Sequence, residues 1–349
     1  MARVVALILH AAPPSDAGPL ERAFDAIRRA NAQRHAAGFR AVGAEALVDE
    51  ERAGSFGERV RGFVLERRPD GIVLLGSGGL PLTNAKDWRT FVAAAGGPSG
   101  RALANNRFSA DVIAIAGASV LSDLPDIASD NALPRWLAER GVAVADLRGQ
   151  WRLQLDLDSP LDALLVRPDR ATVDLEGAGV PTGTVRGALA AVAAAVTDPA
   201  SELVVTGRAS GSGLTWLERK TPSRTRALIE ERGFRTRRSG QRPVRSALGL
   251  ILDRDGPAAL GERLAELGDA ALVDSRVLIA HRFGADERAW PRAEDRFASD
   301  LLLADRIADP WLQALTRSAL DAPIPIVLGG HTLVGPGLRL ALRKAAAWT

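Results

Sequence analysis

The sequence predicts an α/β protein built from two packed α/β units, and two observations carry that prediction. Short apolar runs typical of buried strands, such as Arg3–Leu9 and Gly71–Leu75, alternate with longer segments that repeat apolar residues at helical spacing. In the first half this alternation continues to about Val166, which is the strand–helix–strand pattern of a three-layer, mostly parallel sheet. It resumes at Glu202–Thr206, so we expect a second α/β unit there.

The same patterns predict the individual elements in order. In the first half we expect strands at Arg3–Leu9, Ala41–Val48, Gly71–Leu75, Asp111–Ile115, Val142–Leu147 and Trp151–Asp158, and helices at Leu20–Ala37, Phe56–Glu66 and Asn84–Ala95. In the second half we expect helices at Thr184–Thr197 and Pro257–Leu267, and strands at Glu202–Thr206, Ala247–Leu252, Ala270–Ala280 and Ile324–Leu328. The stretch Arg167–Gly183, rich in Gly, Pro and charge, predicts domains at 1–168 and 201–349, with a linker and helix over 169–200.

The composition excludes several classes of protein. Of the 349 residues, 46% are hydrophobic and 25% charged, as in ordinary globular proteins, and the absence of cysteine excludes disulfides and thiolate catalysis. The pI near 10 reflects the lack of Tyr and Cys and the scarcity of Lys, because the net charge is only +3. The apolar runs are too short to cross a bilayer and the N-terminus lacks a signal peptide's apolar core, so we expect a cytoplasmic protein without a membrane partner.

The most informative stretch is Arg152–Asp162. Apolar and polar residues alternate up to Asp158, which predicts a half-buried strand, and the Ser-Pro that follows predicts a turn and a helix from about Pro160. Asp156, Asp158 and Asp162 therefore cluster at a strand end, where α/β sheets bind ligands, and clustered carboxylates suit Mg²⁺. The alternative is an acidic turn in which Asp158 caps a helix.

The segment Asp-Leu-Asp-Ser-Pro-Leu-Asp at 156–162 resembles the corresponding junction of nucleotidyltransferases with the GT-A-like fold, among them the molybdenum-cofactor and 2-phospholactate guanylyltransferases. The resemblance covers the first half of the chain and implies a GT-A or Rossmann-like domain that binds an NTP. It also implies an acidic residue at this junction that holds the metal bridging the nucleotide phosphates. On this basis Asp156 and Asp158 are predicted Mg²⁺ ligands, and Asp158 is a predicted catalytic residue.

Two loops depart from that family. After the first strand the family has a Gly-rich loop with Arg and Lys for the triphosphate, whereas His10–Pro19 has one Gly and no basic residue. After the strand at Gly71–Leu75 the family has an aspartate before its Pro-x-Leu, whereas this chain has Gly78 or Gly79 there. The loop Gly76, Ser77, Gly78 and Gly79 is still a predicted nucleotide-binding segment, because glycine lets a ligand approach the backbone. The alternative is a tight loop without a ligand.

Polar residues also precede the strand at Asp111–Ile115. Asn105 and Asn106 suit a base or a sugar hydroxyl, and Arg107 suits a phosphate, so these three are predicted nucleotide or substrate contacts. Similar segments precede the corresponding strand in the nucleotidyltransferases that the chain resembles.

The second half resembles no family, but two of its loops have the composition of a site. Arg208 and Ser210 lie in a Gly/Ser loop between a strand and a helix, which is an anion-binding layout; the alternative is a plain tight turn. His331 follows a double glycine at a strand end, where it suits proton transfer; the alternative is a structural histidine.

Two charged stretches complete the second half. The segment Arg219–Arg245 holds ten Lys or Arg and two Glu, but Phe234 is its single aromatic residue, which disfavours nucleic acid and favours a solvated face or a subunit contact. A homo-oligomer is left open. The segment Trp290–Asp300 is expected to form an ion-pair network at a domain or subunit contact, or otherwise a polar pocket.

Three hypotheses follow. The first is a nucleotidyltransferase-like protein that uses Mg²⁺ to transfer a nucleotidyl group from an NTP to a small molecule bearing a phosphate or a hydroxyl group. The second is a catalytically degenerate binding or scaffold protein, because both loops lack the family's charged residues. The third is an enzyme with its site in the second half, around Arg208, Ser210, His281, Arg296 and His331.

Overall fold

The computed structural model describes residues 2–50, 54–127, 130–166, 175–232 and 242–343. Its contacts divide the chain into two compact units. Unit 1 consists of Met1–Pro13 and Asp25–Leu157, and unit 2 consists of Pro14–Phe24 and Asp158–Thr349. The division after Leu157 comes earlier than the predicted boundary at 168, because helix α5 (Pro160–Leu165) packs against α11 (Ala293–Asp300) of unit 2. Residues 167–174, the first part of the predicted linker stretch, lie outside the described residues.

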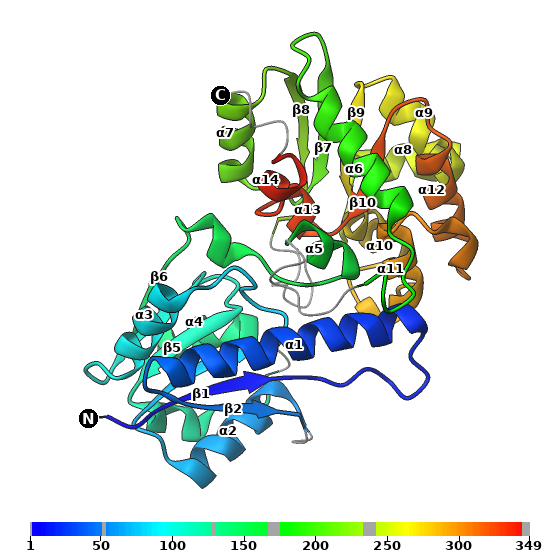
Figure 1. Cartoon of the computed structure of the whole chain (residues 1–349). Helices are drawn as coiled ribbons and strands as arrows, with labels where there is room; N and C mark the ends of the chain where they lie inside the picture. Colours follow the sequence, from blue (N-terminus) through cyan, green and yellow to red (C-terminus); the bar gives the residue numbers. More distant parts are fainter. Residues whose placement is uncertain (1, 51–53, 128–129, 167–174, 233–241, 344–349) are drawn as a thin grey trace. The chain divides into compact units, whose positions relative to one another are not determined.

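Unit 1 is built on a six-stranded sheet in the order β2-β1-β3-β5-β4-β6 (Figure 1). The strands are β1 (Val4–Leu9), β2 (Glu45–Asp49), β3 (Gly71–Gly76), β4 (Arg101–Ala104), β5 (Val112–Ala116) and β6 (Ala143–Asp146). Neighbouring strands are parallel except that β5 runs antiparallel to both β3 and β4. The mostly parallel sheet that the sequence predicts is therefore confirmed.

Helices cover both faces of this sheet and follow from the sequence. They are α1 (Pro19–Ala41), α2 (Phe56–Arg67), α3 (Ala85–Ala95) and α4 (Leu133–Glu139). Alternate residues of β1 face opposite layers, so that Val5 and Leu7 pack with α2 whereas Ala6 and Ile8 pack with α1. Capping boxes at Ser55 and Asn84 start α2 and α3, as Ser and Asn side chains favour.

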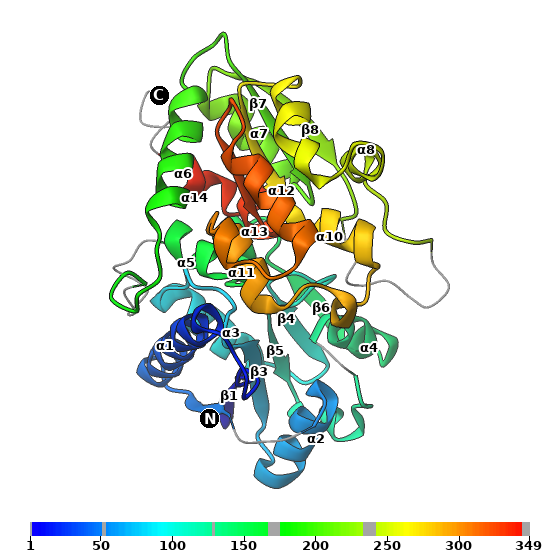
Figure 2. The ribbon, with the colours of Figure 1, turned by 90° about the vertical axis from the view of Figure 1, so that its right-hand side faces the viewer.

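Unit 2 is built on a four-stranded, fully parallel sheet in the order β10-β9-β7-β8. The strands are β7 (Glu202–Gly207), β8 (Arg224–Ile229), β9 (Ala270–Asp274) and β10 (Ile326–Gly329). Besides α5 and α11, the helices are α6 (Gly183–Ala195), α7 (Gly211–Lys220), α8 (Ala247–Asp255), α9 (Leu260–Ala265), α10 (Ser275–Phe283), α12 (Pro310–Leu320), α13 (His331–Val334) and α14 (Leu338–Ala341). Figure 2 shows α11 and α12, in orange, beside one another.

The segment Pro14–Phe24 joins unit 2 through the N-terminal turns of α1. The carboxylate of Glu294 accepts hydrogen bonds from the backbone N–H of Leu20 at 3.1 Å and of Glu21 at 3.0 Å. The ring of Phe24 packs edge-on against Phe297 with 5.0 Å between centroids. These contacts cap and anchor the start of a helix whose later turns belong to unit 1.

Three predicted strands differ in the structure. The segment Trp151–Asp158 is not a strand: Trp151–Gln154 forms a 3₁₀ turn, and Asp156 makes a single antiparallel bridge with Gly79. The segment Ala247–Leu252 belongs to helix α8, whose first turn is capped by Ser246. The predicted strand Ala270–Ala280 ends at Asp274, where α10 begins. Among the described residues no helix is both long and apolar enough to cross a membrane.

Candidate functional site

The carboxyl edge of the unit 1 sheet brings two loops together where β1 and β3 lie side by side. From β1 the chain crosses to β2 on one side and then returns to β3 on the other, so this is the point at which the strand order reverses. Open α/β sheets bind ligands at such a point. His10 follows β1 and Ser77 follows β3, and both side chains are buried.

A chain of hydrogen bonds runs through these two residues. The Nδ1 atom of His10 lies 3.0 Å from Ser77 Oγ, and its Nε2 atom lies 2.9 Å from Asp25 Oδ1. A carboxylate only accepts, so the Nε2–H donates to Asp25 and Nδ1 accepts from the Ser77 hydroxyl. Burial and the charge of Arg28 lower the pKa of His10, although the carboxylate of Asp25 opposes that shift. His10 is therefore neutral at pH 7.

Arg28 of helix α1 links the two loops. Its Nε donates to Ser77 Oγ at 3.2 Å, and its Nη2 donates to the carbonyl of Ala11 at 3.3 Å. The sequence shows no basic residue in the loop after β1, but this guanidinium, which comes from the following helix, places a positive charge at that same loop. Arginine is well suited to bind phosphate there.

The predicted nucleotide-binding loop Gly76–Gly79 is held by its neighbours. Asn31 Nδ2 donates to the carbonyls of Ser77 at 2.8 Å and Gly79 at 2.9 Å, and the carbonyl of Gly78 accepts from the backbone N–H of Leu157 at 3.0 Å. A Cβ at Gly78 would lie 2.7 Å from the carbonyl oxygen of Leu157, so glycine is required there. These carbonyls therefore fix the loop within unit 1.

The predicted substrate residues before β5 have different surroundings. Asn105 is fully buried: its Nδ2 donates to Asp111 Oδ2 and the carbonyl of Leu153, and its Oδ1 accepts from the backbone of Asp111 and Val112. This is a structural role at the end of β4. Asn106 Oδ1 accepts from the backbone N–H of Phe108, and the guanidinium of Arg107 lies 5.7 Å from the centre of the Phe108 ring, which is exposed.

The two predicted metal ligands belong to different units. Asp156 lies in unit 1 beside the Gly78 loop, where its Oδ1 accepts from the backbone N–H of Leu157 at 2.9 Å, whereas Asp158 lies in unit 2. Within the described ranges no three His, Cys, Asp or Glu side chains are grouped so that they could hold a metal ion. The described residues by themselves therefore offer no complete cage, and Asp156 is the carboxylate of the predicted pair that unit 1 supplies.

The carboxyl edge of the unit 2 sheet gathers a second set of charged groups. Arg208 follows β7 and forms two hydrogen bonds with Asp274 at the end of β9, Nε to Oδ2 at 2.6 Å and Nη2 to Oδ1 at 3.0 Å. Both side chains are buried. Burial alone would raise the pKa of Asp274, but Arg208 lowers it overall, so the pair is ionised.

The two predicted catalytic residues lie together in unit 2. His331 begins the helix after β10, and its Nδ1 lies 3.5 Å from Asp158 Oδ2. The two side chains are 34% and 27% exposed, so both reach solvent. The carboxylate of Asp274 is close enough to His331 for a positive charge on the histidine to lower the pKa of Asp274.

Asp162 lies in the first turn of α5, four residues after Asp158, and is almost fully buried. Its Oδ2 accepts from the backbone N–H groups of Asp158 and Ser159, both at 2.8 Å, and this fixes the start of α5. Burial and the carboxylates of Asp158 and Asp300 raise the pKa of Asp162 well above its usual value. Its Oδ1 has no hydrogen-bond partner among the described residues.

The other predicted residues of the second half have structural partners. The hydroxyl of Ser210 caps α7 by accepting from Gly213 N–H at 3.1 Å. His281 accepts from the backbone N–H of Ser246 and lies 2.9 Å from Asp253, and the guanidinium of Arg296 lies 5.4 Å from the Trp290 ring centre. Part of the Arg-rich segment, 233–241, lies outside the described residues.

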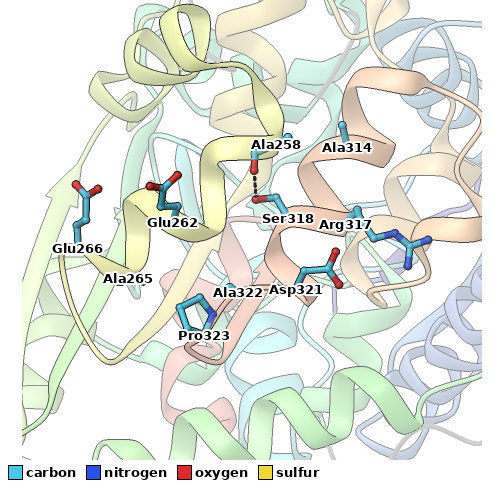
Figure 3. Close-up of a pocket in the computed structure, with 10 residues that line it drawn as sticks. All are labelled: Ala258, Glu262, Ala265, Glu266, Ala314, Arg317, Ser318, Asp321, Ala322 and Pro323. Atoms are coloured by element: carbon cyan, nitrogen blue, oxygen red, sulfur yellow. Dashed lines mark hydrogen bonds between the residues drawn. The ribbon is translucent and has the colours of Figure 1, made fainter.

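A surface pocket of unit 2 lies away from these groups. Figure 3 shows Glu262 and Glu266 on one wall and Arg317, Ser318 and Asp321 on the other, with Ser318 Oγ donating to the carbonyl of Ala258 at 2.7 Å. The lining residue Pro323 precedes β10, so the pocket lies beside the segments that lead into β9 and β10. It contains none of the predicted site residues.

Sequence analysis overlooked the polar face of α1. Asp25, Arg28, Asn31 and His35 recur at intervals of three and four residues, so they share one face of the helix. That face points at the loops after β1 and β3. The same spacing is visible in the sequence.

No family model matches the chain, and no curated protein matches it. Among solved structures it is similar to a nucleotidyl transferase from Methanothermobacter thermautotroptrophicus, with 11% identity over 49% of this chain and 99% of the other, at a TM-score of 0.35. It is also similar to CMP:2-keto-3-deoxy-manno-octonic acid synthetase complexed with CTP, with 14% identity over 42% of this chain and 89% of the other, at a TM-score of 0.25. Similarities of this size carry no argument about the substrate of this chain.

Proposed function

We propose that the protein binds an NTP at the carboxyl edge of the unit 1 sheet and transfers a nucleotidyl group to a small molecule that carries a phosphate or a hydroxyl group. The observation that carries this proposal is the position of Arg28, whose guanidinium contacts both loops at the point where the strand order reverses. The resemblance of residues 156–162 to the nucleotidyltransferase junction supports the same reading.

Nucleotidyl transfer requires positive charge near the phosphates and a fixed geometry of the reacting groups. In nucleotidyl transfer the acceptor oxygen attacks the α-phosphorus, the bond from that phosphorus to the bridging oxygen breaks, and pyrophosphate leaves with the electron pair. Arg28 would neutralise phosphate charge, and the hydrogen bonds from Ser77 through His10 to Asp25 hold Arg28 against the loops. Because the side chain of Ser77 is buried, it positions Arg28 rather than reacting itself.

Mg²⁺ remains part of the proposal as an ion shared with the substrate. Protein sites usually hold Mg²⁺ through one or two carboxylates together with substrate phosphates, and Asp156 is the unit 1 carboxylate suited to that role. Bound there, the ion would neutralise charge on the nucleotide phosphates.

A thermal-shift experiment tests this function. ATP, GTP, CTP and UTP are each added with and without Mg²⁺, and a ligand at 100 times its dissociation constant stabilises the folded protein by about 2.7 kcal/mol, which is a shift of several degrees. We expect one base to give the largest shift, and we expect Arg28→Gln to lose it. Arg89→Gln removes the same charge from an exposed position of α3 and keeps the shift.

Two results would contradict the proposal: equal nucleotide shifts in Arg28→Gln and in the wild type, or no shift with any nucleotide. The alternative is a degenerate binding or scaffold protein, and the hydrogen bonds that occupy the carbonyls of the Gly76–Gly79 loop favour it. A base-specific shift without pyrophosphate release in the presence of acceptors would identify that alternative.

A further inference from the structure

We propose that unit 2 carries an acid–base site of its own, in which His331 accepts a proton from water or from the hydroxyl group of a neutral ligand and Asp158 orients the imidazole ring. The site is separate from the nucleotide function proposed for unit 1. It rests on contacts within unit 2 alone.

The topology places these residues where a ligand is expected. In the order β10-β9-β7-β8 the chain crosses from β7 to β8 on one side and then to β9 on the other, so the strand order reverses between β7 and β9. Arg208 directly follows β7, Asp274 is the last residue of β9, and His331 comes after Gly330 at the end of β10. Parallel sheets bind ligands at this edge.

His331 differs from the other histidines in its access to solvent. The chain has four histidines, and the side chains of His10 and His281 are 0% and 2% exposed, whereas that of His331 is 34% exposed. His35 is also buried. A base that acts on a ligand must reach it, so His331 is the histidine of this chain placed to do so.

The position of Asp158 is fixed from behind. Asp162 Oδ2 accepts hydrogen bonds from the backbone N–H groups of Asp158 and Ser159. Leu161 packs against the end of β10, where a Cβ added at Gly329 would lie 2.9 Å from Leu161 Cδ2. The start of α5 therefore packs against β10, the strand that precedes His331. The Nδ1 to Oδ2 separation of 3.5 Å is long for a hydrogen bond, but such contacts commonly shorten when a ligand binds.

The unpartnered Oδ1 atom of Asp162 indicates the class of ligand. Buried polar side-chain atoms nearly always have a hydrogen-bond partner, and this one has none among the described residues. A water molecule or a ligand hydroxyl would satisfy it. A water or hydroxyl is also what a neutral imidazole can deprotonate.

The surrounding charges disfavour a phosphate ligand. Arg208 is neutralised by Asp274, and Arg276 is neutralised by Asp300 through two hydrogen bonds of 2.7 and 2.6 Å. All four side chains are buried. Each of these two buried guanidinium groups already faces its own carboxylate, so the edge suits a neutral ligand better than an anion.

The proposed step is a single proton transfer. Asp158 accepts from Nδ1–H and leaves the lone pair of Nε2 directed away from the carboxylate. The O–H bond of the water or ligand breaks and an Nε2–H bond forms, while the oxygen keeps the electron pair and becomes the nucleophile. Asp158 then stabilises the imidazolium, as the carboxylate does in other Asp–His pairs. Asp158 is a positioning residue because it acts through His331.

The tautomer of His331 provides the first test. Long-range proton–nitrogen spectra of the full chain at pH 8 report which ring nitrogen carries the proton, and the signals missing from His331→Gln identify His331. We expect the Nδ1–H form in the wild type and its loss in Asp158→Ala. Asp305→Ala removes an exposed carboxylate from the same unit and leaves the tautomer unchanged. The same tautomer in the wild type and Asp158→Ala would overturn the proposal.

Reactivity provides the second test. Diethyl pyrocarbonate should modify His331 before the other three histidines, as measured by mass spectrometry of peptides. The protein should also hydrolyse p-nitrophenyl acetate with water as the nucleophile, and His331→Gln should lower that rate on the order of 100-fold. Equal rates in the wild type and His331→Gln, or equal modification of all four histidines, would overturn the proposal. These measurements contain no nucleotide, so they are independent of the Arg28 experiment.

Discussion

Arg208 and Asp274 lie at the ends of the neighbouring parallel strands β7 and β9, and their side chains meet through two hydrogen bonds of 2.6 and 3.0 Å. The backbone N–H of Arg208 donates to the same carboxylate at 3.2 Å. The two residues are separated by 66 positions in the chain. This buried pair joins the two loops at which the strand order of unit 2 reverses.

Breaking this pair should destabilise the protein strongly. Asp274→Ala leaves the guanidinium of Arg208 buried without its carboxylate, and the expected loss is about 3 kcal/mol in the free energy of unfolding. Urea unfolding followed by circular dichroism measures it. The exposed pair Arg288 and Asp286 is the control: Asp286→Ala should leave the unfolding midpoint nearly unchanged. Equal effects of the two substitutions would contradict the structural role of the buried pair.

Gly207 should tolerate no side chain. Its φ is +107°, and a Cβ would lie 2.3 Å from Asp274 Cβ, so Gly207→Ala combines backbone strain with a displaced Asp274. We expect a loss of roughly 3 kcal/mol in the free energy of unfolding. Gly187→Ala, in α6 where a Cβ would meet nothing within 4 Å, should instead stabilise by up to about 1 kcal/mol. Thermal unfolding of both variants would show opposite shifts; a stabilised Gly207→Ala would refute the prediction.

His35 should make unit 1 sensitive to acid. Its Nδ1 accepts from Trp88 Nε1–H, so its proton lies on Nε2 and donates to the carbonyl of Gly79. Burial, together with the charge of Arg34, lowers the pKa of His35 to about 3, against 6.5 for an ordinary histidine. Between these pH values the unfolded chain binds a proton at His35 and the folded chain does not. The free energy of unfolding therefore decreases as the pH falls from about 6.5 towards 3.

At about 1.4 kcal/mol per pKa unit, the full loss attributable to His35 is roughly 5 kcal/mol. His35→Gln cannot take up that proton, so its stability should fall less steeply than that of the wild type between pH 7 and pH 4. Urea midpoints at several pH values measure the two slopes. Parallel slopes would mean that His35 does not control the acid sensitivity.

Asp162 should give the opposite dependence on pH. Its pKa is raised by burial and by Asp158 and Asp300, so the folded chain holds the proton to higher pH than the unfolded chain does. That contribution to stability is complete below the unfolded pKa and is lost as the pH rises through the folded pKa. Asp162→Asn does not ionise, so the wild type should lose its advantage over this variant as the pH rises above the usual range of an aspartate. A pH-independent difference between the two would contradict the raised pKa.

The sequence identified the sheet of unit 1 because its central strands are continuous apolar runs. The strands β1, β3 and β5 are buried on both faces, which leaves no polar residue to interrupt the pattern. The segment Trp151–Asp158 misled the prediction because Leu153, Leu155 and Leu157 are buried at every second position without forming a sheet ladder. Alternating burial is a property of extended chain, whether or not a neighbouring strand pairs with it.

Helix α8 shows the limit of short apolar runs. Leu248 and Leu252 are buried, whereas Leu250 is 57% exposed, so the run Ala247–Leu252 follows a helical face rather than a buried strand. The sequence singles out Asp158 and His331 as separate candidates, and their 3.5 Å proximity depends on tertiary structure. Arg28 was overlooked because its partners, Ser77 and Ala11, lie in loops that the sequence alone does not bring to α1.

The capping of α1 by Glu294 has a consequence for synthesis on the ribosome. The backbone N–H of Leu20 donates to Glu294, 274 positions later in the chain. The ring of Phe24 likewise packs against Phe297, which is also made near the end of synthesis. Translation therefore delivers the first turns of the longest helix at the beginning and their partners near the end. Until residue 297 leaves the exit tunnel, those turns have an uncapped end and an uncovered aromatic ring. Completion of the N-terminal helix is thus a late event of synthesis, because its capping and packing partners are made near the end of the chain.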